Sequence, residues 1–308
     1  MEQDVSKPNR MLILATSRPP FLVLTPCCLL VAVAYAVADG VTIDYLHLLL
    51  IVIGALAAHV SVNMFNEFED FSSGLDFSTQ RTAFSGGSGT LPKMPTLAKA
   101  VHLGAVMSLL VTIAIGVYLV PIGGWPLLPI GLVGVMLIYF YTSQITRHPM
   151  VCLMAPGLAF GPLMICGAYS VLSGRNHPAV FGASLIVFFL VNNLLLLNQF
   201  PDAEADHSVG RRHLPIVIGR RKSAWVYLMF LIAAYGALLA NIGLGWLPIA
   251  GAIGLLPLLI AKPLVKTLLS HYDDMQALQS AMASNVAITL ATPVLIAAGV
   301  LWSNGWPG

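Results

Sequence analysis

The chain has 308 residues, of which 57% are hydrophobic and only 9% are charged. A soluble domain carries about 25% charged residues, so this composition excludes an ordinary soluble protein and is typical of a polytopic membrane protein. The formal net charge of +2 says little about partners by itself, and no nucleic-acid partner is expected.

Apolar runs of roughly 17–25 residues, long enough to cross a bilayer, recur along the chain. Nine runs are predicted as transmembrane helices: 20–38, 43–65, 97–121, 125–142, 150–173, 178–198, 223–243, 246–268 and 281–302. Pro156 and Pro162 lie inside the fifth run and predict a kink there. The sequence thus predicts an all-α, polytopic membrane protein with nine helices around a central cavity, as a single domain over residues 1–308.

Lysine and arginine are distributed unevenly between the two predicted sides of the membrane. The N-terminal tail and the loops after the even-numbered helices hold nearly all of them, and only Arg175 falls on the opposite side. Positively charged loops stay in the cytoplasm, so we expect a cytoplasmic N-terminal tail, 1–19. Two long cytoplasmic loops are expected at 66–96 and 199–222, and loops of that length in a compact membrane domain are usually functional.

The stretch from Asn66 to Asp76 carries four carboxylates in eleven residues at the end of an apolar run. Asn66 and Asp70 are four residues apart, and Glu67 lies three residues before Asp70. Asp76 follows Ser72-Ser73-Gly74, where the helix is expected to break. Unpaired charge near lipid costs several kcal/mol, so this stretch is expected to hold a cation.

A second stretch repeats this arrangement. Asn198, Asp202 and Asp206 are spaced i, i+4, i+8, so on a continuing helix they share one face. Carboxylates in that register repel each other unless a cation lies between them, and the helix C-terminus adds partial negative charge. Acidic and amide oxygens are the ligands that Mg²⁺ prefers, usually together with substrate phosphates. Two such stretches facing each other predict a site for a metal-bridged diphosphate.

Arginine residues follow both acidic stretches. Arg81 and a glycine-rich segment, 85–89, come after the first, and Arg211 and Arg212 come after the second. Arginine forks match phosphate oxygens, and glycine-rich backbone can approach them closely. For Arg211, Arg212, Arg220 and Arg221 the alternative is that each only sets membrane topology, and for any one of them the two interpretations are equally weighted. Topology alone explains Arg220 and Arg221 adequately.

Together these motifs resemble the UbiA superfamily of intramembrane prenyltransferases, most closely its menaquinone-pathway (1,4-dihydroxy-2-naphthoate polyprenyltransferase) branch. The first motif of that branch is Asn-Asp-x-x-Asp with a further Asp six residues later, and here it reads Asn66-Glu67-Phe68-Glu69-Asp70 with Asp76. The second motif is Asn-x-x-x-Asp-x-x-x-Asp-x-x-x-Gly-Lys-Arg, and here Asn198, Asp202 and Asp206 precede Gly210-Arg211-Arg212. Glu67 stands where the branch usually has Asp, and Arg211 where it often has Lys.

The resemblance implies a Mg²⁺-dependent transfer of a prenyl group from a polyprenyl diphosphate to an aromatic or other electron-rich acceptor, with release of pyrophosphate. Two Mg²⁺ ions are then expected at the site, held by the metal ligands Asn66, Glu67, Asp70, Asp76, Asn198, Asp202 and Asp206. Asp70 and Asp202 are expected to be essential for catalysis, and Arg81, Arg211 and Arg212 to bind the diphosphate. The enzyme is expected in a bacterial inner or equivalent membrane, with its site facing the cytoplasm.

Several further polar and aromatic residues have two interpretations. Tyr139 and Tyr141 are candidates to stabilise an allylic cation, although an interfacial aromatic belt explains either one somewhat better. Asn63 is a candidate substrate contact, and His59, one turn earlier, is either an acid–base group or, more simply, a packed polar residue. The intramembrane amides at 192–193 are predicted to hydrogen-bond helices together.

Two other functions fit parts of the pattern. A cation-coupled secondary transporter would use Asp70 and Asp202 to bind its coupling ion, but transporters place such residues near the bilayer midplane. A phosphoribosyl-type transferase acting on a polyprenyl phosphate, from the same superfamily, is the second alternative. The sequence does not identify the acceptor or the length of the donor chain.

Overall fold

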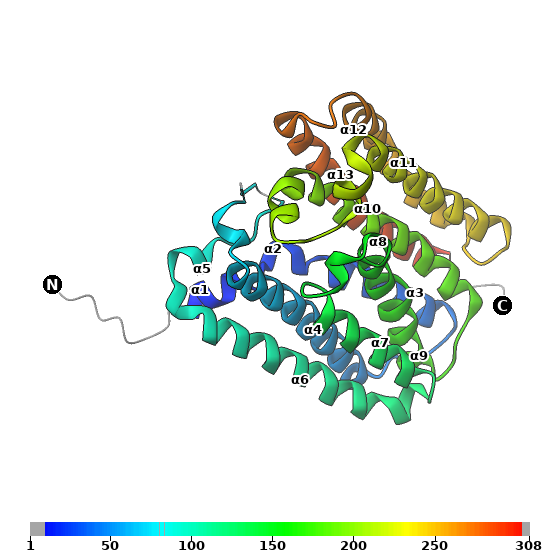
Figure 1. Cartoon of the computed structure of the whole chain (residues 1–308). Coiled ribbons are helices and arrows are strands. Elements are labelled where there is room, and N and C mark those ends of the chain that lie inside the picture. The colour runs from blue at the N-terminus through cyan, green and yellow to red at the C-terminus, as the bar shows by residue number, and fades with distance from the viewer. Residues whose placement is uncertain (1–9, 80, 83, 304–308) are drawn as a thin grey trace.

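The computed structural model describes residues 10–79, 81–82 and 84–303, and every regular element in these ranges is a helix. The long elements, shown in Figure 1, are α3 (Leu24–Ala38), α4 (Tyr45–Ser72), α6 (Ala98–Gly123), α7 (Leu127–Phe140), α10 (Pro178–Ser208), α11 (Leu214–Gly243), α12 (Leu258–Ser270) and α13 (Met275–Trp302). One further helix is continuous through α8 (Pro149–Leu158), the π-helix η4 (Ala159–Cys166) and α9 (Gly167–Ser173). Short elements connect these: α1 (Arg10–Ala15), α2 (Pro19–Leu22), η1 (Leu75–Phe77), α5 (Thr90–Lys93), η2 (Pro95–Leu97), η3 (Ile145–Arg147) and η5 (Ile249–Leu255).

Helical structure lies at each of the nine predicted positions. Eight helices within the described ranges are long and apolar enough to cross a membrane. The ninth, α7, has 14 residues, fewer than the roughly 20 that a bilayer requires. The chain is therefore an integral membrane protein in which α7 is short, and the prediction of nine full spans is met by eight in the described part of the chain.

The first acidic stretch is helical as far as Ser72, so the loop predicted at 66–96 begins only after that residue, where the helix was expected to break. Helix α4 continues to Ser72, and the chain turns only at Gly74, whose φ of +81° is the left-handed conformation that glycine adopts without strain. The polar residues after the apolar run continue the helix, and two of them have buried partners: Glu67 accepts from Arg18, and Asp70 pairs with Arg211. A hydropathy pattern does not reveal such partners. Asn66, Glu67 and Asp70 thus lie on a rigid helix.

The loop predicted at 199–222 is wrong. Helix α10 continues to Ser208, and α11 begins at Leu214, so the two helices are joined by residues 209–213 alone. Gly219, with φ +81° and ψ 156°, interrupts α11 just before the seventh apolar run begins. The first turns of α11 therefore precede the apolar run that predicted the helix.

Helix α10 lies at the centre of the bundle, packed against α11, α13, α8 and η4, while α4 packs along α6 (Figure 1). Buried amides join α10 to its neighbours. Asn193 Nδ2 donates to the carbonyl of Tyr227 at 2.9 Å, and Asn285 Nδ2 donates to the carbonyl of Asn193 at 3.1 Å. Asn192 Oδ1 accepts from the backbone N–H of Gly157 at 2.6 Å. The predicted role of the amides at 192–193 is confirmed.

The fifth predicted helix contains the expected irregularity. Proline has no N–H to donate, so Pro156 and Pro162 each remove one helical hydrogen bond, and a π-helical segment replaces the regular helix at η4. The backbone here touches α10 directly: a Cβ at Gly157 would lie 2.2 Å from the carbonyl oxygen of Phe188. Only glycine permits this approach.

We expect Gly157→Ala to destabilise the protein by about 1–3 kcal/mol, because the added methyl must push α8 away from α10. Gly236→Ala, on α11, is the matched control, since a Cβ there meets no atom of the described residues within 4 Å. The apparent melting temperatures of both variants in detergent micelles check this. Equal melting temperatures for the two variants would contradict the close packing.

Candidate active site

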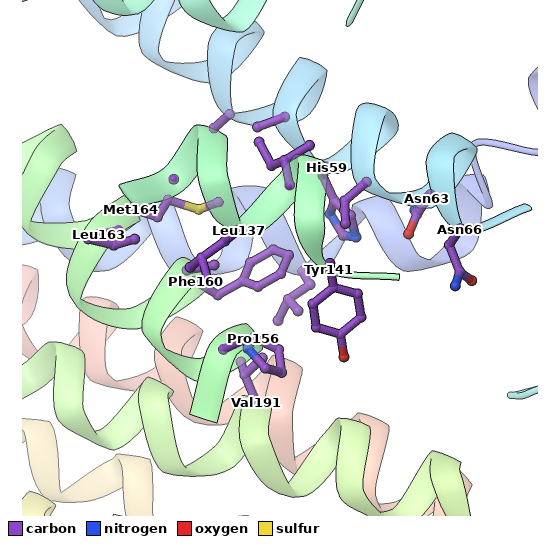
Figure 2. Close-up of a pocket in the computed structure, with 18 of the residues that line it drawn as sticks. His59, Asn63, Asn66, Leu137, Tyr141, Pro156, Phe160, Leu163, Met164 and Val191 are labelled. Carbon is purple, nitrogen blue, oxygen red and sulfur yellow. The ribbon is translucent and has the colours of Figure 1, made fainter. Parts of the chain in front are cut away.

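A cavity of about 630 Å³ opens between α4, α6, α7, η4 and α10. The wall that α4 contributes is apolar from Leu50 to Ala58 and becomes polar toward its C-terminal end, where Asn63, Asn66 and Asp70 line the cavity. Figure 2 shows Asn63 and Asn66 on successive turns of one helix face. The cavity is therefore a long apolar chamber with a polar end, which fits a molecule that has a hydrocarbon body and a polar head.

Both acidic motifs contribute to this polar end. Asp76, in η1, lines it beside Asp70 of the first motif. From α10, Asn198, Asp202 and Asp206 line the same end, so the prediction that these three share one helix face is confirmed. Two segments more than 120 residues apart in sequence thus meet at one site, as the sequence predicted.

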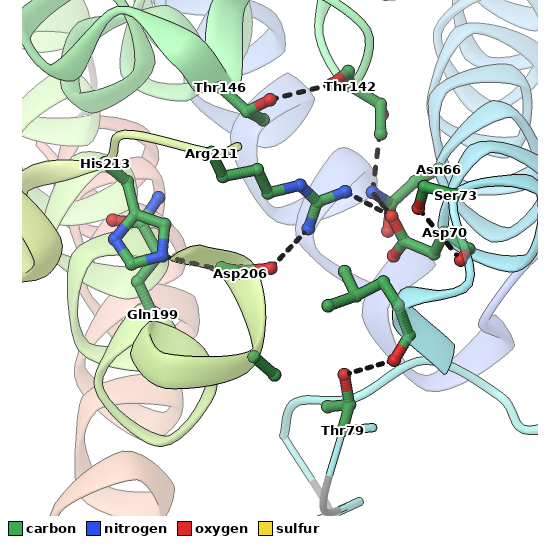
Figure 3. A network of polar contacts seen from close by, with 12 residues as sticks. Asn66, Asp70, Ser73, Thr79, Thr142, Thr146, Gln199, Asp206, Arg211 and His213 are labelled. Carbon is green, nitrogen blue, oxygen red and sulfur yellow. Dashed lines mark hydrogen bonds and ion pairs between the residues drawn. The ribbon is translucent and has the colours of Figure 1, made fainter. Parts of the chain in front are cut away.

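Arg211 joins the two motifs (Figure 3). Its Nη2 pairs with Asp70 Oδ1 in a very short contact, and its Nη1 donates to Asp206 Oδ1 at 2.8 Å. Gly210, with φ +83°, turns the chain so that the Arg211 N–H donates to the carbonyl of Asp206 at 3.1 Å. Burial by itself would lower the pKa of Arg211, but the carboxylates of Asp70 and Asp206 outweigh burial and raise that pKa, so the guanidinium stays charged.

His213 completes this network. Its Nε2 lies 2.8 Å from Asp206 Oδ2, so both carboxylate oxygens of Asp206 have a partner. His213 is buried and lines the cavity. The sequence flanking Asp206 offered no signal for this role beyond the position of His213 in a polar connection.

Three oxygens at the polar end have no hydrogen-bond partner among the described residues: Asp76 Oδ2, Asn198 Oδ1 and Asp202 Oδ1. A buried oxygen without a donor is costly, and carboxylate and amide oxygens are the ligands of hard divalent cations. The donor set therefore fits Mg²⁺. In the part of the chain that the structure describes, no three His, Cys, Asp or Glu side chains are already arranged around a metal position. The Arg211 guanidinium contacts two of the acids that such a cation would need.

Asp76 differs from the other acids because it lies outside the apolar helices. Its pKa is raised to about 7, first because its carboxyl is buried and second because Asp70 and Glu67 are close. Arg81 and Arg18 oppose this rise.

Three residues predicted at the site lie at its margin or outside it. Arg81 is exposed, and its Nη2 donates to the carbonyl of Asp76 at 3.1 Å. Arg212 is exposed, and its backbone N–H donates to the carbonyl of Thr146. Tyr139 is 56% exposed and packs edge-on against Phe65. None of the three side chains lines the cavity within the described ranges.

Other predicted residues do line the cavity. Tyr141 lies in its wall, with its hydroxyl 4.0 Å from Cys152 Sγ. Asn63 also lines it, while its Nδ2 donates to the carbonyl of Ser17 at 2.8 Å. His59 is a packed polar residue, with an Nδ1···Oγ1 hydrogen bond of 2.9 Å to Thr25, and it also lines the cavity (Figure 2).

Glu67 and Arg18 form a separate part of the site. Glu67 is buried and does not line the cavity, and its Oε1 accepts from Arg18 Nε at 2.8 Å. Arg18 Nη2 donates to Asn66 Oδ1, also at 2.8 Å, and Arg18 does line the cavity. Arg18 lines the polar end of the cavity but was not among the site residues predicted from the sequence. It lies 48 residues before Asn66, and its only sequence signal was a positive charge on the cytoplasmic side.

The chain is similar to known proteins over most of its length. A family model described as the UbiA prenyltransferase family matches residues 27–286. The chain is 28% identical over 199 residues to 1,4-dihydroxy-2-naphthoate octaprenyltransferase of Bacillus subtilis (strain 168), which covers 63% of this chain and 62% of that protein. It is 29% identical over 161 residues to digeranylgeranylglyceryl phosphate synthase of Pyrococcus horikoshii, which covers 51% of this chain and 55% of that protein. The chain therefore matches less than two thirds of the length of either relative.

Solved structures share the fold over nearly the whole chain. The apo structure of a UbiA homologue from Aeropyrum pernix K1 aligns with a TM-score of 0.69 at 15% identity, covering 92% of this chain and 98% of that one. A UbiA homologue from Archaeoglobus fulgidus, bound to GPP and Mg²⁺, aligns with a TM-score of 0.61 at 16% identity, covering 93% and 99%. At such identities these likenesses show a common architecture.

Proposed function

The chain belongs to the UbiA prenyltransferase family, and from that premise we propose that it transfers a prenyl group from a polyprenyl diphosphate to an electron-rich acceptor and releases pyrophosphate. The observation that carries this proposal is the shape and chemistry of one cavity. Its apolar length suits a prenyl chain, and its polar end brings Asp70 and Asp202 together from two helices. A diphosphate bridged by cations matches that end in charge and in ligand type.

Mg²⁺ would be held by the acids and amides of the two motifs. The unpartnered oxygens of Asp76, Asn198 and Asp202 would be its first ligands, and Asp70 and Asp206 would become available once the guanidinium of Arg211 moves. Asn66 Oδ1 accepts from Arg18 Nη2 and would have to exchange that donor for the metal. When bound, the metal supplies Lewis-acid stabilisation of the leaving diphosphate. The homologue from Archaeoglobus fulgidus, bound to GPP and Mg²⁺, supports this assignment.

The chain's own residues bind and orient the donor. Arg211, already between the motifs, is placed to contact the diphosphate, whereas Arg81 and Arg212 are candidates of lower rank because they lie outside the cavity. The apolar walls exclude water from the reacting carbon, which protects a developing allylic cation from hydrolysis. Tyr141, whose ring lines the cavity, is the better placed of the two tyrosines to stabilise that cation.

The two relatives are named for acceptors of different chemical classes, an aromatic compound and a glyceryl phosphate. The Bacillus subtilis relative is named for 1,4-dihydroxy-2-naphthoate and the Pyrococcus horikoshii relative for a glyceryl phosphate. An aromatic quinone precursor is the acceptor we propose. The site is proposed to face the cytoplasm, because the basic residues near both motifs follow the positive-inside pattern.

Purified protein supplied with Mg²⁺ and a labelled polyprenyl diphosphate is expected to release pyrophosphate and form one prenylated product from a panel of acceptors that includes 1,4-dihydroxy-2-naphthoate and geranylgeranylglyceryl phosphate. Product masses identify the acceptor. Chelation with EDTA is expected to abolish turnover, and added Mg²⁺ is expected to restore it, because the leaving diphosphate then regains its counter-charge.

Full activity in EDTA would refute the metal-dependent mechanism. Substrate counterflow in proteoliposomes, without any prenylated product, would favour a transporter in its place. A prenylated glyceryl phosphate would keep the reaction and replace the proposed acceptor.

A further inference from the structure

The pair formed by Arg18 and Glu67 lies beside the metal-binding motif and has no role in the function proposed above. Arg18 connects α1 to α2, with φ +53° and ψ 62°, and is the only non-glycine residue with positive φ among those described. This turn brings its guanidinium back to α4, where it reaches both Asn66 and Glu67. The N-terminal segment is thereby attached to the first acidic motif.

Glu67 already accepts three hydrogen bonds. Besides Arg18 Nε, the backbone N–H of Ser88 donates to its Oε1 at 2.7 Å, and the hydroxyl of Ser88 donates to its Oε2 at 2.6 Å. Its side chain is fully buried and outside the cavity wall. A buried carboxylate already held by three donors, one of them cationic, is poorly suited to ligate a metal, since Oε1 would first have to lose a donor and the Glu67 side chain does not reach the cavity wall.

The Arg18 guanidinium is held by two of its three nitrogens. Its Nε and Nη2 donate to Glu67 and Asn66, while its Nη1 has no hydrogen-bond partner among the described residues. The guanidinium lines the polar end of the cavity, and its side chain keeps 23% exposure. Two of the three nitrogens thus fix the plane of the fork, and the third has no partner that would have to be released before it binds a ligand.

The glycine-rich segment, 85–89, packs against the Arg18 guanidinium at Gly87. A Cβ at Gly87 would lie 3.1 Å from Glu67 Oε1, 3.3 Å from Asp76 Oδ1 and 3.5 Å from Arg18 Nη2. Gly87 also has φ +72°, so a side chain there would be strained as well as crowded. Arg18, Glu67 and Asp76 therefore converge on one point of the polar end, next to the proposed metal ligands.

We propose that Arg18 binds the donor diphosphate through Nη1 and that Glu67 is a positioning residue that acts through Arg18, not a metal ligand. The proposal rests on the donor site proposed above. A planar guanidinium fixed by a carboxylate and an amide loses little freedom on binding, and charged forks match phosphate oxygens. It also accounts for Glu67 in place of the usual Asp. The additional methylene lets the carboxylate reach Arg18 and Ser88 from the buried side of α4.

The test uses inorganic pyrophosphate with Mg²⁺, titrated calorimetrically into the purified full-length protein. Arg18→Met is expected to weaken pyrophosphate binding about tenfold or more, the usual loss of a charged hydrogen bond. Arg10→Met is the matched control, because Arg10 is an exposed arginine of the same N-terminal segment, and it should bind like the wild type. The KM for the prenyl donor should rise in Arg18→Met more than kcat falls.

Glu67→Gln separates positioning from metal ligation. It is expected to weaken pyrophosphate binding when Arg18 is present and to have no further effect in an Arg18→Met background. Binding of Mn²⁺ alone, followed by electron paramagnetic resonance, should be unchanged. A clear loss of Mn²⁺ affinity in Glu67→Gln would assign Glu67 as a ligand and overturn its positioning role.

The double variant Arg18→Met/Glu67→Gln keeps the test decisive even if a single variant folds poorly, because it leaves no unpaired buried charge. Recovery of wild-type pyrophosphate affinity in this variant would reduce the pair to a structural ion pair and overturn the proposal, while continued weak binding supports it. Wild-type protein that binds no pyrophosphate with Mg²⁺ would overturn the proposed function and this inference together. Wild-type binding that Arg18→Met retains would overturn this inference alone.

Discussion

Asp202→Asn is expected to lower the rate of prenyl transfer at least about a hundredfold while the protein keeps its fold. Asp202 lines the polar end of the cavity, and its Oδ1 has no hydrogen-bond partner among the described residues, so that atom is available to a cation. Removing its charge weakens the counter-charge to the diphosphate and breaks little that holds the fold. Pyrophosphate release and the apparent melting temperature, measured on the same preparation, separate the two effects.

Glu204→Gln is the matched control, two residues further along α10. Its side chain is 89% exposed and lies 3.4 Å from Arg220 Nη1, away from the cavity. Exposed ion pairs contribute little to the free energy of unfolding, and Glu204 does not line the cavity. Activity and stability should therefore both stay at the wild-type level. Near-normal turnover in Asp202→Asn, or an equal loss in Glu204→Gln, would refute the assignment of Asp202.

Arg211→Met is expected to lower both stability and activity. The guanidinium is the common partner of Asp70 and Asp206, and its removal leaves buried carboxylates without their cation, a loss of about 3–5 kcal/mol. His213 still contacts Asp206, so the larger effect is expected at Asp70. The melting temperature without metal measures the loss, and added Mg²⁺ should recover part of it by supplying a cation to the same acids.

The neighbouring arginine provides the control for this experiment. Arg212→Met removes the same charge from the next residue, but the Arg212 side chain is exposed and outside the cavity. Its melting temperature should match the wild type. If Arg212→Met were destabilised as much as Arg211→Met, or if Mg²⁺ failed to stabilise Arg211→Met, the bridge between the two motifs would not have the role given to it here.

The site illustrates which contacts a sequence pattern can reveal. Asn198, Asp202 and Asp206 were predictable as a group because their spacing is a property of any helix. The second motif could also be matched to the first, because both carry Asn and Asp four residues apart. Arg18 could not be found in this way. Its link to Asn66 depends on a left-handed turn at Arg18 and on how the N-terminal segment packs on α4, and neither leaves a periodic signal.

The two apolar runs end before the motif helices do, for a related reason. Hydropathy ends at Phe65 and near Leu197, yet α4 and α10 continue through their acidic residues to Ser72 and Ser208. Buried ion pairs and hydrogen bonds hold the last turns of both helices. Asp70 and Glu67 of α4 pair with residues distant in sequence, whereas Asp206 of α10 pairs with the nearby Arg211 and His213, whose role no hydropathy pattern reveals. Tyr139 and Tyr141 show the same limit: both belong to one aromatic run, but only Tyr141 lines the cavity.

The sequence by itself determined that the chain is a helical membrane protein with two acidic motifs, because the length and hydropathy of a span and the spacing of ligands are local properties. Only the tertiary structure decided how the acids are neutralised: Arg211 bridges the two motifs, and Arg18 pairs with Glu67, which lies outside the cavity. The physical reason is that a buried charge is stabilised by whichever partner the fold brings within about 3 Å, and sequence separation does not limit that choice.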